Sequence, residues 1–285
     1  MAVEQIGIVG SGIMGSGVAE VAAKAGHTVV LRSRTQAGAD GMIAGLEKSL
    51  AKQVERGKLE EADGDAVLGR VRGVTDLGEL EKCDLVLESI VEDLATKKHL
   101  FNELDRICGD ATILATNTST LPVIELAMET GRPDRVCGVH FFNPAPAMPL
   151  VEIVRALTTS DDTLAAARDF ASKCGKTVVD VKDQAGFIVN ALLFPYLNNA
   201  VKMLDAGVAT RDGIDAAMKG GCNFPMGPLE LLDLVGLDTS LSILEALYAE
   251  FTDPNYAPAP LLRRMVSAER LGRKTSEGFY DYHKK

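Results

Sequence analysis

The sequence predicts an α/β fold in which a doubly wound, mostly parallel sheet is followed by an all-helical C-terminal domain. A strand, a helix and a second strand follow one another over residues 5–32, and such a unit implies a parallel pair of strands. Further strand candidates recur up to about residue 154, with helical stretches between several of them. Strand signals disappear after about residue 182, so we expect an α/β domain over residues 1–183 and a helical domain over residues 184–285.

The strands and the first helix follow from local patterns in the chain. Gln5–Val9 is a short apolar run that ends at a glycine and predicts a buried strand. Gly15–Ala25 is rich in alanine and valine and precedes Gly26, so it predicts a helix with a glycine after its last residue. Thr28–Arg32 predicts the next strand. Four more short apolar runs predict the others: Leu85–Leu87, Ile113–Thr116, Arg135–His140 and Val151–Val154.

The C-terminal part of the chain shows helical patterns only. The expected helices are Asn190–Leu204, Arg211–Lys219, Pro228–Leu234, Thr239–Phe251 and Leu261–Glu269. The proline-rich segment Pro254–Pro260 separates the last two helices and is expected to be a rigid connection.

The composition is that of an ordinary folded protein and argues against some partners. Of the 285 residues, 46% are hydrophobic and 25% are charged, and the formal net charge of −10 argues against a nucleic-acid partner. The cysteines are odd in number and never form a Cys-x-x-Cys pair: Cys83, Cys108, Cys137, Cys174 and Cys222. We interpret them as reduced thiols. Since no secretory signal or membrane-spanning stretch is visible either, we expect a cytoplasmic protein with no membrane partner and no metal site.

A glycine motif joins the first strand to the first helix. Its residues are Gly10, Ser11, Gly12, Ile13, Met14 and Gly15. The first glycine permits a tight turn, the second lets the backbone approach a pyrophosphate, and the third allows the helix to pack closely on the strand. The N–H groups at the helix start attract phosphate. A merely glycine-rich turn is the alternative, but the flanking strands and helix favour a Rossmann-type dinucleotide site.

The end of the second strand bears on which dinucleotide binds. This position commonly holds an acid that accepts hydrogen bonds from the ribose hydroxyls, about 20 residues after the glycines. Here it holds Ser33, followed by Arg34. An acid repels a 2′-phosphate, whereas serine and arginine can bind one, so the pattern favours NADP over NAD. The alternative is that Arg32 and Arg34 lie on a solvated edge and that the cofactor is NAD.

One of the four histidines stands where a catalytic base is expected. His140 ends a strand, and ligands of open α/β sheets bind at the carboxyl ends of the strands. The other histidines lie in a turn, on a charged helix and in the C-terminal tail: His27, His99 and His283. Glu152 lies in an otherwise apolar strand, where an unpaired acid is costly, so we expect it to meet a cation and to orient His140. The pair predicts removal of a hydroxyl proton as hydride leaves an alcohol carbon.

Several longer segments resemble the L-3-hydroxyacyl-CoA dehydrogenase family, and within it the bacterial 3-hydroxybutyryl-CoA dehydrogenases. They read GSGIMGSGVAE, ATNTST, HFFNPAPAMPLVEIV, DQAGFIVNALLFPYLNNA, FPMGPLELLDLVGLD and GRKTSEGFYDY, and the similarity runs over nearly the whole chain. The decisive segment is HFFNP with a glutamate twelve residues after its histidine.

The resemblance implies a role for several residues. His140 would be the general acid and base, with Glu152 holding its ring, while Ser119 and Asn190 would place the substrate oxygen. Asn143 would be a cofactor contact or a positioning contact beside the nicotinamide. Further cofactor contacts would come from Glu92, Lys97 and Lys274. Without the resemblance, these three would be interpreted as surface charges.

A helical stretch in the N-terminal domain could bind the coenzyme A portion. Ser49, Lys52 and Arg56 are spaced three and seven residues apart, which places them on one helix face. Ser49 and Arg56 resemble the family's CoA-binding positions, although Arg56 replaces an expected lysine. The alternative is a solvated charged face, because Glu47 and Glu55 lie nearby.

The resemblance implies reversible oxidation of (S)-3-hydroxybutyryl-CoA to acetoacetyl-CoA, in fatty acid or butanoate metabolism. Two departures stand out: Ser33 replaces the usual acid, and Thr120 stands where a second serine is common. The rival interpretations are a hydroxyacid or sugar-acid dehydrogenase that uses no CoA, and a catalytically silent dinucleotide-binding protein. The relatives imply a homodimer through helices such as Leu229–Leu237, which from sequence could equally be the core of one chain.

Overall fold

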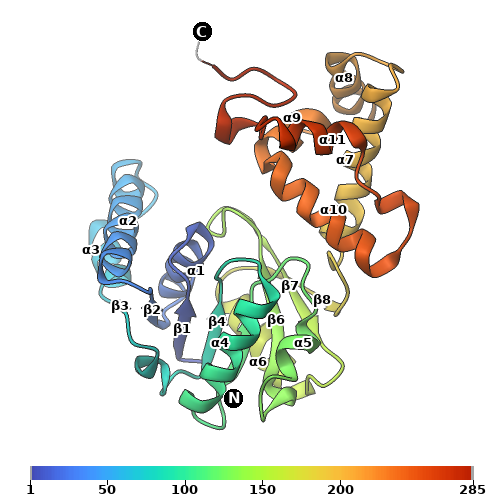
Figure 1. Cartoon of the computed structure of the whole chain (residues 1–285). Helices are drawn as coiled ribbons and strands as arrows, with labels where there is room; N and C mark the ends of the chain where they lie inside the picture. Colours follow the sequence, from blue (N-terminus) through green and yellow to red (C-terminus); the bar gives the residue numbers. More distant parts are fainter. Residues whose placement is uncertain (1, 284–285) are drawn as a thin grey trace. The chain divides into compact units, whose positions relative to one another are not determined.

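The computed structural model of the chain describes residues 2–283. They divide into two compact units, one ending at Asp183 and the other beginning at Gln184 (Figure 1). The first unit contains every strand of the sheet, and the second contains only helices and short 3₁₀ turns among its described elements. Within residues 2–283, no helix is long and apolar enough to cross a membrane.

The first unit is built on an eight-stranded sheet with the order β3-β2-β1-β4-β5-β6-β7-β8. The strands are β1 (Gln5–Val9), β2 (Thr28–Arg32), β3 (Val71–Val74), β4 (Leu85–Glu88), β5 (Ile113–Thr116), β6 (Val136–Phe141), β7 (Leu150–Arg155) and β8 (Thr177–Lys182). Neighbours from β3 to β6 pair in parallel, β6 and β7 pair antiparallel, and β7 and β8 pair in parallel. The change of direction at β7 has a direct consequence for the site described below.

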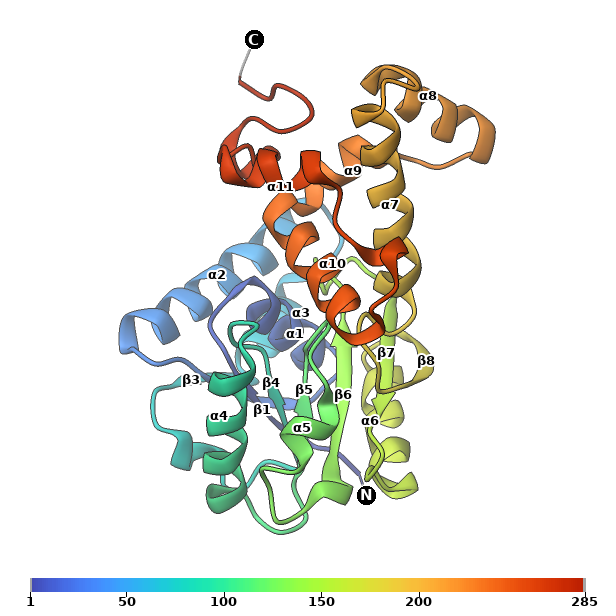
Figure 2. The same ribbon diagram turned by 45° about the vertical axis from the view of Figure 1, so that its right-hand side comes forward.

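Helices cover both faces of this sheet (Figures 1 and 2). They are α1 (Ile13–Lys24), α2 (Gln36–Glu55), α3 (Glu61–Leu68), α4 (Leu94–Ile107), α5 (Val123–Ala127) and α6 (Asp161–Lys173), with the 3₁₀ turns η1 (Leu77–Leu80) and η2 (Pro133–Arg135). Alternate residues of a strand face opposite sides. Ile6 and Ile8 of β1 therefore share one buried core with Val18 of α1 and Phe170 of α6. Because both faces are covered, the central strands read as continuous apolar runs.

The second unit contains α7 (Val189–Asp205), α8 (Arg211–Cys222), α9 (Pro228–Val235), α10 (Leu237–Phe251) and α11 (Pro260–Ser267), with η3 (Pro254–Tyr256) and η4 (Arg273–Thr275). Its own core includes Leu197, Leu244 and Leu262, all fully buried. All five predicted helices are present, each within three residues of its expected bounds.

Two buried aspartates hold the end of the chain against this helical core. Asp215 accepts hydrogen bonds from the backbone of Leu229 and from the hydroxyl of Tyr280, at 2.9 and 2.8 Å. Asp233 accepts from the backbone of Phe279 and Tyr280, both at 2.8 Å. Burial raises the pKa of Asp233, although these hydrogen bonds oppose it. The GRKTSEGFYDY segment is therefore held against the helical unit by these hydrogen bonds.

Candidate functional site

The glycine motif forms the turn between β1 and α1, at the carboxyl end of β1. Gly10 has a φ of +135°, and a side chain there would collide with the backbone of Ser89. A side chain at Gly15 would collide with the carbonyl of Gly10. A Cβ at Gly12, by contrast, would meet no atom within 4 Å among the described residues. Gly12 also caps α1 without a side-chain hydrogen bond, so the turn fits a dinucleotide pyrophosphate at the helix start.

Exposed apolar side chains flank this turn. Ile13 is 77% exposed, while Val91, which follows the neighbouring strand β4, is 65% exposed. Ser11 is also exposed, and Met14 is half-buried against the core of the unit. Apolar surface beside an open helix N-terminus suits a ligand that carries both phosphates and flat rings.

The end of β2 carries positive charge. Ser33 is buried, and its backbone N–H donates to the carbonyl of Val74 at 2.9 Å. Arg34 is exposed and forms no ion pair within the described part of the chain. Burial lowers the pKa of the Arg32 guanidinium, an effect opposed by the charge of Glu103 and reinforced by that of Arg34. Two guanidinium groups that repel each other would be stabilised by an anion between them.

His140 and Glu152 face each other across the antiparallel strands β6 and β7. β6 and β7 run in opposite directions, and in their register His140 pairs directly with Glu152. His140 Nδ1 lies 2.7 Å from Glu152 Oε2, and the two residues are 4% and 0% exposed. A carboxylate can only accept, so Nδ1 carries the proton and Nε2 can accept one. The predicted orientation of His140 by Glu152 agrees with this geometry.

Ser119 supplies a hydroxyl to the other ring nitrogen. It lies in the loop after β5, and its Oγ is 3.2 Å from His140 Nε2. The same loop is fixed to β6 by Asn117, whose Oδ1 accepts the backbone N–H of Phe141 at 2.7 Å. Serine, histidine and glutamate therefore form one hydrogen-bonded line at the carboxyl edge of the sheet. Such a line can take a proton from a bound hydroxyl and return it.

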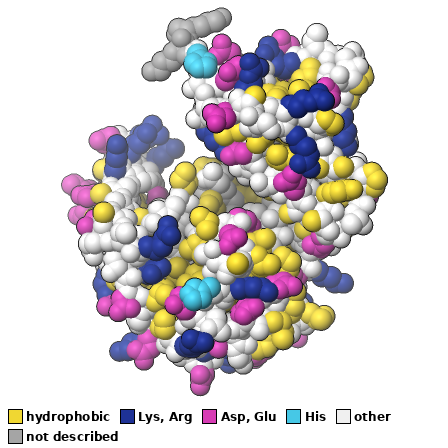
Figure 3. All heavy atoms as spheres, in the orientation of Figure 1, with side chains coloured by type: hydrophobic (Ala, Val, Ile, Leu, Met, Phe, Trp, Pro, Cys, Tyr) yellow, Lys and Arg dark blue, Asp and Glu magenta, His cyan; other side chains and the backbone are white. Residues whose placement is uncertain are grey.

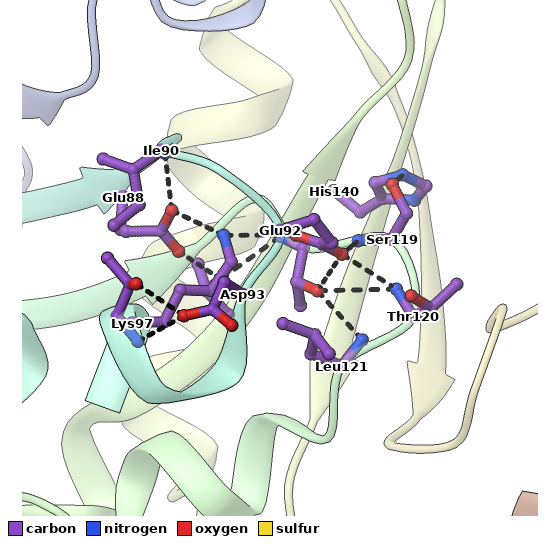
Figure 4. Close-up of polar contacts among 12 residues, drawn as sticks. Glu88, Ile90, Glu92, Asp93, Lys97, Ser119, Thr120, Leu121 and His140 are labelled. Atoms are coloured by element: carbon purple, nitrogen blue, oxygen red, sulfur yellow. Dashed lines mark hydrogen bonds and ion pairs between the residues drawn. The ribbon is translucent and has the colours of Figure 1, made fainter. Parts of the chain in front are cut away.

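Glu92 and Lys97, predicted as cofactor contacts, lie beside this loop (Figure 4). Lys97 is only 1% exposed, and its Nζ is 2.6 Å from Glu88 Oε1 and 3.2 Å from Glu92 Oε2. The alternative interpretation of Lys97 as a surface charge is therefore wrong. Sequence reasoning missed Glu88, which ends an apolar strand and is fully buried. Like Glu152, Glu88 is an acid at an apolar strand, and such an acid requires a cationic partner, which is the signal that the sequence offers for it.

The predicted CoA-binding residues lie at the end of α2. Lys52 is exposed near the last turn, and Arg56 is the exposed residue that caps the helix. Neither forms an ion pair among residues 2–283, and Figure 3 shows Lys and Arg side chains gathered over this end of α2. Ser49 is half-buried, and its hydroxyl donates to Glu20 at 2.9 Å. Burial alone would raise the pKa of Glu20, but hydrogen bonds from Lys24 and other neighbours lower it overall.

The other predicted site residues are distributed over both units. Asn143 is exposed in the segment after β6, close in sequence to His140. Asn190 is the second residue of α7 and is 9% exposed. Lys274 lies in η4 and forms an ion pair with Asp238. The roles assigned to these three residues stay predictions.

Comparisons with known proteins identify relatives along the whole chain. A family model described as the NAD binding domain of 3-hydroxyacyl-CoA dehydrogenase matches residues 5–184, and one described as its C-terminal domain matches residues 186–282. The chain is 47% identical to a 3-hydroxybutyryl-CoA dehydrogenase of Clostridioides difficile, with 98% of this chain and all of that protein covered.

Two solved structures are similar in fold as well as in sequence. The crystal structure of FadB2 from M. tuberculosis has a TM-score of 0.97 at 46% identity, covering 99% of this chain and all of that one. The (S)-3-hydroxybutyryl-CoA dehydrogenase PaaH1 from Ralstonia eutropha gives a TM-score of 0.97 at 43% identity, with the same coverage. The similarity therefore extends over both units.

Proposed function

The chain belongs to the 3-hydroxyacyl-CoA dehydrogenase family, and from this premise we propose that it interconverts (S)-3-hydroxybutyryl-CoA and acetoacetyl-CoA. It is an oxidoreductase that uses a nicotinamide dinucleotide. The observation that carries the proposal is the hydrogen-bonded line of Ser119, His140 and Glu152 at the carboxyl edge of the sheet. The open glycine turn follows β1 at the same edge of the sheet. In the sheet, β4 and β5 lie between β1 and β6.

In the oxidation direction, His140 Nε2 removes the proton of the substrate hydroxyl. The bound nicotinamide supplies the hydride acceptor. Glu152, 2.7 Å from Nδ1, keeps the ring in the tautomer that can accept at Nε2 and stabilises the imidazolium that results. The Ser119 O–H proton points to Nε2 while that nitrogen is the acceptor, and it can turn to the substrate oxygen once Nε2 has taken the substrate proton. In the reduction direction, the imidazolium returns its proton to the same oxygen.

The proposed preference for NADP(H) rests on the end of β2. Ser33, Arg34 and Arg32 would hold the 2′-phosphate through a hydroxyl and two guanidinium groups. Replacing Ser33 by aspartate would place a carboxylate beside that phosphate and repel it. The proposal predicts that Ser33→Asp shifts the ratio of kcat/KM values toward NADH.

The proposed CoA site is the end of α2, where Lys52 and Arg56 are exposed and have no acidic partner in the described chain. The 3′-phosphate and pyrophosphate of coenzyme A are anions that such cations bind. Ser49 would accept a hydrogen bond from a hydroxyl or an amide N–H of coenzyme A, because its own proton is donated to Glu20. The formal net charge of −10 does not oppose this, because the cations are local.

We propose that the protein forms a homodimer through its helical unit. The predicted interface segment Leu229–Leu237 does not contribute all of its residues to that interface. Leu229, Leu232 and Leu237 are fully buried in the unit's own core, so the core alternative holds for these residues. Other apolar side chains are left uncovered, including Leu192 and Phe224, which are 72% and 43% exposed. Such groups are expected to be covered by a second copy.

The free cysteines support a reducing, cytoplasmic location. Burial raises the pKa of Cys137 to about 12, so this thiol stays protonated and unreactive.

The deciding experiment offers acetoacetyl-CoA with NADPH and with NADH side by side and follows oxidation of the reduced nicotinamide. Parallel assays offer free acetoacetate and gulonate. Turnover of the thioester alone supports the proposal, and faster turnover of either free acid would favour a dehydrogenase that uses no CoA. A strong preference for NADH would refute the 2′-phosphate role of Ser33 and Arg34.

A further inference from the structure

The ends of β4 and β5 carry a buried polar network that no catalytic step described above requires. Glu88 is the last residue of β4, and Thr116 is its register partner at the end of β5. Both are fully buried. Glu88 Oε2 accepts the Thr116 hydroxyl at 2.7 Å, and Glu88 Oε1 accepts the backbone N–H of Ile90 at 2.6 Å. The Glu88 carboxylate is thus held both by β5 and by the turn that follows β4.

Lys97 extends this network from α4. Its Nζ donates to Glu88 Oε1 at 2.6 Å and lies 3.2 Å from Glu92 Oε2 (Figure 4). Taking a lysine and a carboxylate out of water costs several kcal/mol per ion in rough terms, and an apolar pair of similar volume is often no less stable. A buried ion pair at this position is therefore better explained by a role in orienting its neighbours than by a gain in stability.

Glu92 links the buried pair to the loop that carries Ser119. Its side chain is 39% exposed, and its Oε2 lies 3.2 Å from Lys97 Nζ, on the side of the buried pair. Its Oε1 accepts the Thr118 hydroxyl at 2.5 Å, and the backbone N–H groups of Ser119 and Thr120 at 2.8 and 3.3 Å. One carboxylate oxygen thus holds three donors of consecutive residues, and the middle residue contacts His140.

We infer that Glu88 and Lys97 are positioning residues, which act through Glu92 to hold Ser119 at hydrogen-bonding distance from His140 Nε2. The inference rests on the proposed function, because it assigns the network to the same proton-transfer step. Misplacement of a reacting group by about 1 Å can reduce a rate 100-fold, so the precision of this loop matters to catalysis. The network thus runs from Glu88 through Lys97 and Glu92 to the loop that carries Ser119.

The first test compares Glu88→Gln with the wild type in acetoacetyl-CoA reduction. Glutamine keeps the size and the acceptor oxygen but removes the charge that holds Lys97. We expect kcat to fall by up to about tenfold, no more than in Ser119→Ala, with KM for the dinucleotide nearly unchanged. Asp105→Asn is the matched control: it breaks the 2.7 Å ion pair with Arg132 in the last turn of the same helix, away from the Ser119 loop. This control should keep the wild-type kcat.

A double-mutant cycle separates positioning from general damage. If Glu88 acts by placing the Ser119 hydroxyl, then Glu88→Gln should have much less effect on kcat when Ser119 is already alanine. A merely structural role predicts that the two losses multiply. Thr116→Val keeps the side-chain shape but removes one donor to Glu88 and the acceptor of the Thr118 N–H. It serves as the second variant if Glu88→Gln does not fold, and should lower kcat in the same Ser119-dependent way.

The outcomes distinguish this inference from the proposed function. A wild-type protein that does not reduce acetoacetyl-CoA overturns the proposed function and the role of Glu88 with it. If the wild type is active, two results would overturn the positioning role alone. One is a full kcat in folded Glu88→Gln, and the other is a multiplication of the two losses in the double-mutant cycle.

Discussion

His27 and His140 are both buried histidines of the N-terminal unit, but they lie at opposite edges of its sheet. His27 directly precedes β2 at the amino edge, and His140 lies near the carboxyl end of β6. They are 5% and 4% exposed. Each ring also contacts a phenylalanine ring, Phe170 for His27 and Phe142 for His140, with centroids 5.4 and 4.5 Å apart. Burial and aromatic contact therefore do not distinguish them.

The polar partners do distinguish them. His140 has the Glu152 carboxylate at one nitrogen and the Ser119 hydroxyl at the other. His27 Nε2 is buried and has no hydrogen-bond partner among residues 2–283. Burial lowers the pKa of His27 and the charge of Lys173 lowers it further, while the backbone of Val3 and Glu4 and the charge of Asp169 only partly oppose them. The amino-edge imidazole is thus kept neutral, whereas the carboxyl-edge imidazole has a group that stabilises its charged form.

The largest effect that follows from this contrast is expected for His140→Ala. Without the imidazole no group is placed to take the hydroxyl proton, so kcat should fall by about 10³- to 10⁴-fold. Dinucleotide binding should be nearly intact, because the glycine turn lies on another strand. Steady-state kinetics and a dinucleotide titration measure the two quantities. His27→Gln is the matched control and should keep the wild-type kcat, and a near-normal rate in His140→Ala would remove the assigned base.

Glu152→Gln should produce the next largest effect. An amide in this position can hydrogen-bond Nδ1 but cannot stabilise the imidazolium, and its N–H₂ can impose the wrong tautomer. We expect kcat to fall by about 10²- to 10³-fold, with the dinucleotide Kd close to that of the wild type. If Glu152→Gln and the wild type had equal kcat values, the Glu152 carboxylate would have no role in catalysis. It would then not be the group that makes His140, unlike His27, a catalytic base.

Ser119→Ala tests the second partner of His140. The substitution removes one hydrogen bond worth about 1.5 kcal/mol, which corresponds to roughly a tenfold lower kcat. The loss should appear in kcat more than in KM for acetoacetyl-CoA, since the hydroxyl is proposed to assist the developing charge. A change confined to KM would instead assign Ser119 to ground-state binding.

Much of the fold could be predicted because local patterns specify its central strands. Gln5–Val9, Thr28–Arg32 and Ile113–Thr116 have the predicted bounds, since they are buried apolar runs. The edge strands β3 and β8 were not predicted. β3 contains Arg72 and Gly73, and β8 is only half-buried, so pairing with a neighbouring strand, rather than local hydrophobicity, forms them.

The site, like the fold, could be predicted from the sequence only in part. His140 and Glu152 could be paired from sequence because an acid in an apolar strand requires a partner. Lys97 was assigned a contact with the cofactor, yet its immediate neighbours are Glu88 and Glu92. That arrangement depends on how the turn after β4 folds back toward the start of α4, a geometry with no periodic signal in the sequence.

The smallest predicted effect concerns the amino-edge histidine and the stability of the fold. In the unfolded chain His27 titrates near its usual value of about 6.5, and its folded pKa is lower. As the pH falls through about 6.5, the unfolded state binds a proton that the folded state resists, so stability contributed by neutral His27 is present above this pH and decreases below it. The melting temperature should therefore fall less between pH 7.5 and pH 5.5 in His27→Gln than in the wild type, by no more than roughly 2–4 °C. Identical pH dependence in the two proteins would show that the neutral state of this buried ring does not contribute to stability, and the contrast with His140 would then rest on hydrogen-bond partners alone.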